Sequence, residues 1–190
     1  MERTYTEAKK FEKVNFAESP LEKGDYENCT FINCNFSNTD LSGINFAECE
    51  FAGCNLSMIK ILKTTFREIK FKDCKILGVH FDNCNPLLFT VSFESCILNL
   101  SSFYKLKFKN THFKNTSLHE TDFTESDISS SIFENCDLSG ATFKNSILEK
   151  ADFRSSYNYL INPEENRIKK AKFSLDGIIG LLNQYDIEIQ

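Results

Sequence analysis

The chain has 190 residues, of which 41% are hydrophobic; this is enough for one domain with a core and argues against disorder. Its formal net charge of −5 argues against direct binding to nucleic acid or to an anionic membrane, because both require a basic patch. No run approaches the roughly 18 apolar residues of a membrane span, and the N-terminal stretch MERTYTEAKKFEKV lacks the apolar segment of a signal peptide. We therefore expect a cytoplasmic protein with reduced thiols.

Large apolar residues recur at every fifth position. The series runs without a gap from Phe11 to Phe81 and resumes from Phe93 to Phe153, and its 28 central positions hold 17 of the 19 phenylalanines. An α-helix would rotate successive centres by roughly 140°, and a flat strand would place them on alternate sides. Every pentapeptide must therefore contain a turn that redirects the chain, with two residues pointing inward and three outward.

The position two residues before each centre holds a small side chain, often Cys, Ser, Thr or Ala. All eight cysteines occupy it: Cys29, Cys34, Cys49, Cys54, Cys74, Cys84, Cys96 and Cys136. A zinc site requires four converging ligands, usually with CxxC-type spacing, whereas these cysteines follow the five-residue period and no histidine shares their position. Since a free cysteine behaves as a small hydrophobe, the pattern favours core packing over a metal site or a disulfide framework. We expect no cofactor.

The stretches CTFINCNFSNTDLSGINF and CDLSGATFKNSILEKADF resemble the pentapeptide-repeat family, whose motif is roughly A(D/N)LxX. The resemblance covers about residues 11–155 and implies an all-β fold, a right-handed quadrilateral β-helix with four pentapeptides per coil. It implies seven coils in a rod about 34 Å long, at about 4.8 Å per coil. On this basis residues 1–10 form a lead-in, residues 11–155 the β-helix, and residues 156–190 a connector, a short α-helical cap and a terminal strand.

A two-residue register break falls near residues 86–88. Twelve residues separate Phe81 from Phe93, where ten would keep the register. Pro86 has no N–H group for a central ladder position, so we expect a bulge or small loop there. Two interpretations remain open: a simple kink of the rod, or an apolar contact point for a partner. The bulge would be formed by Pro86, Leu87, Leu88 and Phe89.

The C-terminal segment SLDGIIGLLNQYD predicts a short amphipathic helix with Ser174 as its N-cap, and the tail IEIQ is expected to add a strand. This ending resembles the C-terminal module of the quinolone-resistance (Qnr-like) branch, in which the last helix and strand build a twofold dimer. The resemblance implies a homodimer, with a monomeric cap as the alternative. The dimerisation residues would be Phe173, Leu175, Ile178, Ile179, Leu181, Leu182, Tyr185, Ile187 and Ile189.

Charge is distributed in bands along the sequence. Residues 24–59 and 115–143 contain acids and no Lys or Arg, whereas residues 60–75 and 105–114 are rich in lysine. Members of the Qnr-like branch are thought to mimic DNA, presenting carboxylates to the basic DNA-binding saddle of DNA gyrase or topoisomerase IV. At twenty residues per coil the acids spread over all four sides, so an ordinary solvated surface is the alternative. The candidate partner-binding acids are Asp25, Glu27, Asp40, Glu48, Glu50, Glu120, Asp122, Glu125, Asp127, Glu134 and Asp137.

The sequence contains no enzyme motif that we recognise. His80, His112 and His119 lie in separate repeats and are expected on the surface, and there is no P-loop, GxGxxG motif or nucleophile beside a histidine. We therefore expect a non-enzymatic protein. One hypothesis is a DNA mimic that binds gyrase or topoisomerase IV and protects it from fluoroquinolones. The alternative is a general interaction scaffold for a different protein partner. Neither involves a membrane or direct contact with nucleic acid.

Overall fold

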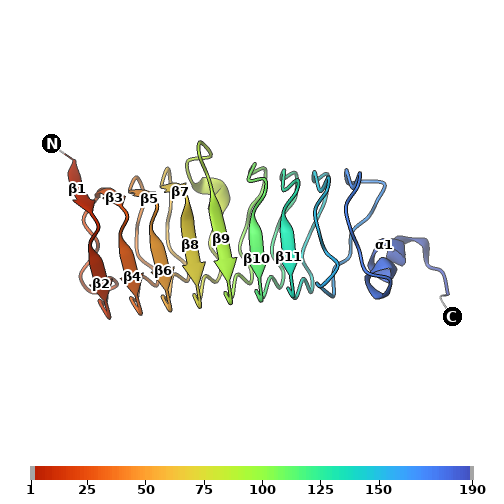
Figure 1. Cartoon of the computed structure of the whole chain (residues 1–190), viewed down its shortest axis with the longest axis horizontal. Coiled ribbons are helices and arrows are strands. Elements are labelled where there is room, and N and C mark those ends of the chain that lie inside the picture. The colour runs from red at the N-terminus through yellow and green to blue at the C-terminus, as the bar shows by residue number, and fades with distance from the viewer. Residues whose placement is uncertain (1–2, 189–190) are drawn as a thin grey trace.

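Short parallel strands on two sides of a coiled chain form the frame of the molecule. The computed structural model describes residues 3–188 and shows a right-handed β-solenoid of about seven turns that extends as a rod (Figure 1). Strand partners lie twenty residues apart along most of the chain, so that Phe31 pairs with Phe51. The predicted all-β quadrilateral solenoid is therefore confirmed. No helix among the described residues is long and apolar enough to cross a membrane.

Two parallel sheets run along the rod. We call their sides the β1 side and the β2 side. The β1 side carries four strands in the order β1–β3–β5–β7: β1 (Thr4–Glu7), β3 (Gly24–Glu27), β5 (Asn45–Ala47) and β7 (Thr65–Arg67). The β2 side carries seven: β2 (Lys10–Glu12), β4 (Thr30–Ile32), β6 (Glu50–Ala52), β8 (Ile69–Lys72), β9 (Val91–Glu94), β10 (His112–Lys114) and β11 (Ile132–Glu134).

The corners between sides explain how a five-residue repeat turns. The residue two after a centre adopts a left-handed backbone at most corners, as at Asn28 (φ 51°), Asn33 (φ 51°) and Gly53 (φ 63°). Asparagine and glycine tolerate this conformation better than other residues. The corner N–H groups donate to the next coil, for example from Asn33 to the carbonyl of Ala52 at 2.8 Å. The turn expected in each pentapeptide is therefore present.

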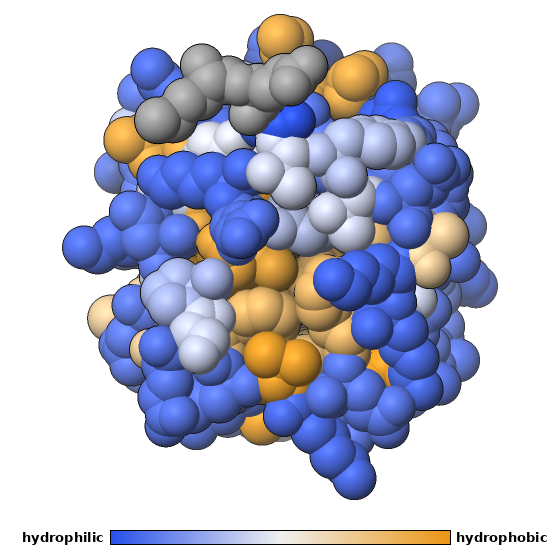
Figure 2. All heavy atoms as spheres, turned by 90° about the vertical axis from the view of Figure 1, so that its left-hand side faces the viewer, coloured by the Kyte–Doolittle hydropathy of each residue, from blue (hydrophilic) through white to orange (hydrophobic). Residues whose placement is uncertain are grey.

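Phenylalanine rings fill the interior in columns that run along the rod. Rings one coil apart stack, as in Phe31–Phe51 with centroids 4.7 Å apart and an interplanar angle of 8°. Rings on adjacent sides of one coil meet edge to face, as in Phe31–Phe36 at 5.6 Å and 69°. Both geometries are favourable for aromatic pairs. Figure 2 looks onto the N-terminal end and shows the apolar centre inside a hydrophilic rim.

At several coils, the small residue two positions before a centre donates a side-chain hydrogen bond to a carbonyl of the preceding coil. The thiols of Cys54 and Cys74 donate to the carbonyls of Phe31 (3.3 Å) and Phe51 (3.2 Å). The hydroxyl of Thr64 makes the same bond to Leu41 (2.7 Å). All eight cysteines are buried, and burial raises the pKa of Cys49 to about 12. Cysteine, serine and threonine are interchangeable here because each is small and donates one bond, as the packing hypothesis requires.

The register break lies where the sequence places it. Strand β8 pairs with β9 at a step of 22 residues, with Phe71 opposite Phe93. A 3₁₀ turn, η1 (Phe81–Asn83), precedes the extra residues, which form a loop rising above the neighbouring coils (Figure 1). Phe89 does not belong to the exposed bulge. Its ring is only 6% exposed and lies between those of Phe66 (6.3 Å) and Phe108 (5.8 Å), continuing the core column.

Both ends of the solenoid extend beyond the expected boundaries. In the lead-in, β1 already pairs with β3. Past Phe153 the coil continues: Asp152 bridges to Lys172, and the rings of Phe153 and Phe173 stack at 5.5 Å and 2°. The period is hidden in the sequence because an irregular stretch interrupts two sides of this last coil. The stretch expected to form the connector therefore includes part of a further coil.

Candidate interaction surfaces

A short helical segment covers the C-terminal end of the rod. It consists of η2 (Asp176–Ile178), α1 (Ile179–Leu182) and η3 (Asn183–Tyr185). The N-cap of η2 is Leu175 and not Ser174, but the hydroxyl of Ser174 accepts a hydrogen bond from the N–H of Gly177 at 3.0 Å. Gly177 and Gly180 face Tyr159, where a Cβ atom would collide with the Tyr159 hydroxyl or carbonyl. The two glycines therefore let the segment approach the last coil closely.

The expected dimerisation residues divide into two groups. Leu181 is buried, and Phe173 and Leu182 are partly buried, so they attach the segment to the rod. Five of the others form an exposed apolar stripe, in which Leu175 is the most exposed residue, with 89% of its surface accessible. A hollow of about 600 Å³ lies beside it, between α1 and the last coil. Residues 186–188 form no strand, and Ile189 lies outside the described residues. The stripe consists of Leu175, Ile178, Ile179, Tyr185 and Ile187.

Several candidate acids hold the turns of the solenoid. At these turns, the side-chain oxygen of the residue immediately before a centre accepts a hydrogen bond from the backbone N–H two positions further along the chain. Asp40 accepts from Ser42 (2.9 Å) and Asp122 from Thr124 (2.8 Å). Asp127 and Asp137 do the same. Asn35 does so too, with its side-chain amide oxygen. These aspartates are explained by local structure, because asparagine and aspartate stabilise such turns with their side-chain oxygen.

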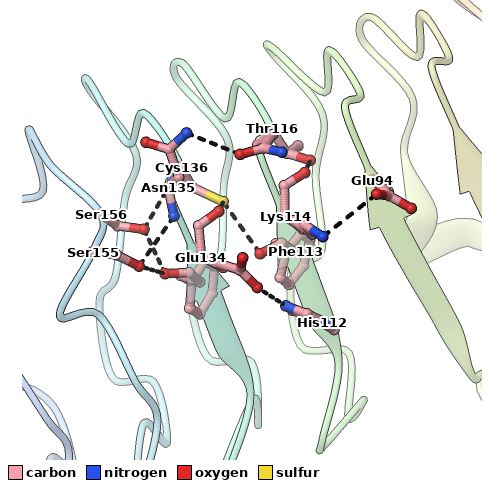
Figure 3. A network of polar contacts seen from close by, with 12 residues as sticks. Glu94, His112, Phe113, Lys114, Thr116, Glu134, Asn135, Cys136, Ser155 and Ser156 are labelled. Atoms are coloured by element: carbon pink, nitrogen blue, oxygen red, sulfur yellow. Dashed lines mark hydrogen bonds and ion pairs between the residues drawn. The ribbon is translucent and has the colours of Figure 1, made fainter.

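Basic or histidine side chains on other coils contact most of the candidate acids. On the β2 side, His112 Nε2 lies 2.9 Å from Glu134, and Lys114 lies 3.6 Å from Glu94 (Figure 3). Arg67 contacts both Glu27 (3.2 Å) and Glu48 (3.7 Å). The remaining pairs are Arg3–Asp25, Lys105–Glu125, Lys109–Asp127 and His119–Asp137. Seven of the eleven candidates are thus paired.

Four candidate acids have no ion-pair partner among residues 3–188: Asp40, Glu50, Glu120 and Asp122. Asp40 and Asp122 lie on the same side, but they are separated along it by Lys60, His80 and Ser102. Glu50 lies on the β2 side, and Glu120 sits at the corner just before Asp122. The carboxylates therefore spread over several sides, as the sequence suggests, and form no continuous acidic band. Glu120 and Asp122 are the closest pair of unneutralised acids in this set.

The loop at the register break presents two leucines to solvent. Leu87 and Leu88 are 72% and 68% exposed, and Pro86 beside them is exposed as well. The side-chain oxygen of Asn85 accepts the N–H of Leu87 (3.1 Å), and its amide donates to Thr65 (3.2 Å), which fixes the loop to the rod. Leu88 forms one wall of a hollow of about 230 Å³ on the β1 side. Of the four residues expected in the bulge, Pro86, Leu87 and Leu88 are therefore exposed, whereas Phe89 is buried.

Comparison with known proteins places the chain in a family. The sequence model of the family described as "Pentapeptide repeat region" matches residues 24–86 and 87–159. The chain belongs to the pentapeptide-repeat family. In this pentapeptide-repeat protein, no group of three or more His, Cys, Asp or Glu residues within 3–188 is arranged to hold a metal ion. No curated protein matches its sequence.

Solved structures of QnrB1, a plasmid-mediated fluoroquinolone resistance protein, share the fold of this pentapeptide-repeat protein. A trypsin-treated variant superimposes with a TM-score of 0.64 at 17% identity, covering 99% of this chain and 98% of that chain. The full-length form gives 0.56 at 17% identity, covering 97% and 100%. At these identities the likeness concerns the fold alone.

Sequence analysis missed a basic surface on the last coils. Arg167, Lys169 and Lys170 follow one another in the last coil, and Lys150 lies one coil earlier on the same side, where its N–H donates to the carbonyl of Lys169 at 3.0 Å. Arg167 pairs with Glu149 (2.6 Å), whereas the three lysines have no ion-pair partner among the described residues. The segment RIKKAK contains three of these basic residues, but it lies in the stretch that was expected to form a connector.

Proposed function

We propose that the protein is a non-enzymatic binding protein whose partner is a type II topoisomerase, DNA gyrase or topoisomerase IV. The observation that carries the proposal is the likeness to QnrB1 over nearly the whole of both chains, including the helical C-terminal end. Among the candidate carboxylates, Glu120 and Asp122 are the strongest contacts for a basic DNA-binding saddle, since they are the two nearest to each other of the four that lack an ion-pair partner within residues 3–188. Binding would protect the enzyme from a fluoroquinolone and place the protein in the cytoplasm.

A supercoiling assay with purified gyrase, with and without a fluoroquinolone, tests this proposal. We expect protection against the drug or inhibition of supercoiling at low micromolar protein. The double variant Glu120→Gln/Asp122→Asn should act about tenfold more weakly, since two exposed charges are removed from a steered contact. Its fold should persist, because an asparagine in place of Asp122 can still accept the N–H of Thr124.

Glu27→Gln is the matched control, because this carboxylate is already paired with the guanidinium of Arg67 at 3.2 Å. It should leave the effect on gyrase unchanged. If the wild-type protein changes neither gyrase nor topoisomerase IV over the micromolar range, topoisomerase binding is wrong. If the control variant loses as much as the double variant, the assignment of the contact to Glu120 and Asp122 is wrong.

We further propose that two copies associate through the C-terminal stripe. Five exposed apolar side chains on one short segment, next to a hollow that a partner's side chains can enter, are typical of an interface. Light scattering at about 0.5 M salt, where charge contacts are screened, should give twice the monomer mass of 21.9 kDa. Leu175→Glu/Ile179→Glu should give the monomer mass, whereas Met58→Glu, an exposed apolar position in mid-rod, should not. A monomeric wild-type protein contradicts the proposal.

A scaffold for a different protein partner is the second candidate, favoured by the exposed Leu87 and Leu88. Binding through these leucines would depend weakly on salt, whereas binding through carboxylates would fall steeply as salt rises. A pull-down with wild-type protein and with Leu87→Ser/Leu88→Ser, washed at low and high salt, separates the two. Retention of one partner at high salt by the wild type alone would favour the scaffold.

A further inference from the structure

The β1 side is divided into two halves of equal length by the projecting loop. Its successive levels are joined by strand pairs, β-bridges and contacts between rings, which stack from Tyr26 to Phe66 and meet edge to face at Phe89. Phe89 is the central level, with Leu87 and Leu88 exposed beside it. Four levels precede it, at residues 6, 26, 46 and 66, and four follow it, at residues 108, 128, 148 and 168. The loop therefore marks the midpoint of this side.

The two halves carry opposite charge. The first half presents five acids (Glu7, Asp25, Glu27, Glu48 and Glu68) and one base, Arg67, which gives −4. The second half presents six bases (Lys107, Lys109, Lys150, Arg167, Lys169 and Lys170) and two acids, Asp127 and Glu149, which gives +4. Arg3 lies at the edge of the first half, paired with Asp25. Internal pairs involve Arg67, Lys109 and Arg167, so Glu7, Glu68 and four lysines have no ion-pair partner among the described residues.

We propose that this side docks on the same side of a second copy, with the two rods antiparallel. A twofold axis that lies in the plane of the interface, at the level of the loop and perpendicular to the long axis of the rod, places each acidic half over the partner's basic half. It also brings Leu87 and Leu88 of both copies together at the centre. Such an interface is self-complementary, as twofold symmetry requires. An apolar centre with charged flanks is the usual anatomy of an interface between proteins.

The size of the side is adequate for weak association. Eight steps of about 4.8 Å give a length of about 38 Å, and five residues at about 3.3 Å give a width of about 16 Å. The projected area is therefore about 600 Å² per copy, against about 800 Å² of accessible surface in a standard interface. Charge attraction across this area makes the association dependent on salt. The inference is independent of topoisomerase binding and of the C-terminal interface.

The test uses the full chain with Leu175→Glu/Ile179→Glu, so that the C-terminal interface does not contribute. Sedimentation equilibrium at about 100 μM protein should show dimer at about 50 mM salt and monomer at about 0.5 M salt. Glu7 and Lys169 occupy the same column at the first and last levels, and the twofold axis brings them together. Glu7→Lys or Lys169→Glu alone should raise the dissociation constant by about tenfold.

The combination of Glu7→Lys with Lys169→Glu should restore the association, which loss of folding could not do. Lys144→Glu, which alters an exposed lysine on another side of the rod, is the matched control and should leave the constant unchanged. Leu87→Ser/Leu88→Ser should weaken the association seen at about 50 mM salt. A mass that does not change with salt overturns the proposal, and so does failure of the double charge reversal to restore pairing.

Discussion

The residue immediately before a centre often supports the following turn with its side chain. Asp40, Asp122, Asp127 and Asp137 each accept the N–H of the residue two positions on, as Asn35 and Asn55 do in other coils. An asparagine and an aspartate are equivalent in this role. The aspartates of this chain therefore contribute to the fold first, and their charge becomes available to a partner only where no neighbouring base neutralises it.

The contribution of the Asp137 carboxylate to stability should depend on pH. Burial raises its pKa, but hydrogen bonds from Ser139, Asn158 and His119 outweigh burial and lower the pKa to about 2. Because the folded pKa lies below the unfolded value of about 4, the unfolded chain binds more protons between these values. The stabilisation, about 1–2 kcal/mol after allowance for solvent screening, is present above pH 4 and is lost as the pH falls through 2.

Urea unfolding between pH 6 and pH 2 measures this contribution. The difference in unfolding free energy between wild type and Asp137→Asn should shrink as the pH falls through this window, because asparagine keeps the turn bonds but does not titrate. A constant difference over the whole range would show that the carboxylate charge does not contribute.

At the scale of an element, the loop at the register break shows how the solenoid absorbs two extra residues. The chain lifts Pro86, Leu87 and Leu88 away from the rod and returns Phe89 to the core column. Contacts between rings thereby remain continuous from Phe66 to Phe108, with Phe89 meeting both rings edge to face. The two leucines are exposed to solvent because the chain leaves the rod here to accommodate the extra residues.

Two substitutions in this loop should have unequal effects on stability. Phe89→Ala removes a ring that contacts three other phenylalanines and should lower the unfolding free energy by about 3–5 kcal/mol. Leu87→Ala removes an exposed side chain and should change it by less than about 0.5 kcal/mol. Thermal or urea unfolding of both variants checks the pair. Equal destabilisation would mean that Phe89 does not fill the core.

The central positions of the solenoid could be predicted because each carries its own signal, a large apolar residue at a fixed period. The last coil could not, because only Ile168 and Phe173 remain of its four centres and the segment between Phe153 and Asn166 conceals the spacing. Pairing of the acids was also beyond prediction. Arg67 reaches Glu27 over a separation of 40 residues, which depends on the exact coil length and on side-chain direction.

At the scale of the whole molecule, the strand pairs and β-bridges of each coil join it only to the coils before and after it. Stability in such a rod is close to a sum of coil terms and interfaces between neighbours, so an uncovered end is the weakest part. The two ends differ here. Phe11 and Val14 are only partly buried at the N-terminal end, whereas the helical segment covers part of the C-terminal end. Central rings such as Phe51 and Phe113 are completely buried.

Hydrogen exchange should therefore be graded along the rod. Backbone amides of β2 are expected to exchange at least about a hundredfold faster than those of β6 or β10, because opening of the first coil breaks one interface and opening of a central coil breaks two. Mass spectrometry of peptides after timed exchange measures the gradient. Uniform protection from β2 to β10 would contradict a rod that opens from its N-terminal end.

The twenty-residue coil has a consequence for how such a chain changes length. Equivalent positions of successive coils hold residues of the same type. When one whole coil is inserted or lost, the coils on either side of it can therefore pack against their new neighbours in the same way. The separation between the Leu87–Leu88 loop and the helical end can therefore take only discrete values, in steps of about 4.8 Å. A partner that binds the loop and the helical end at the same time would therefore select chains with one particular number of coils between these two features.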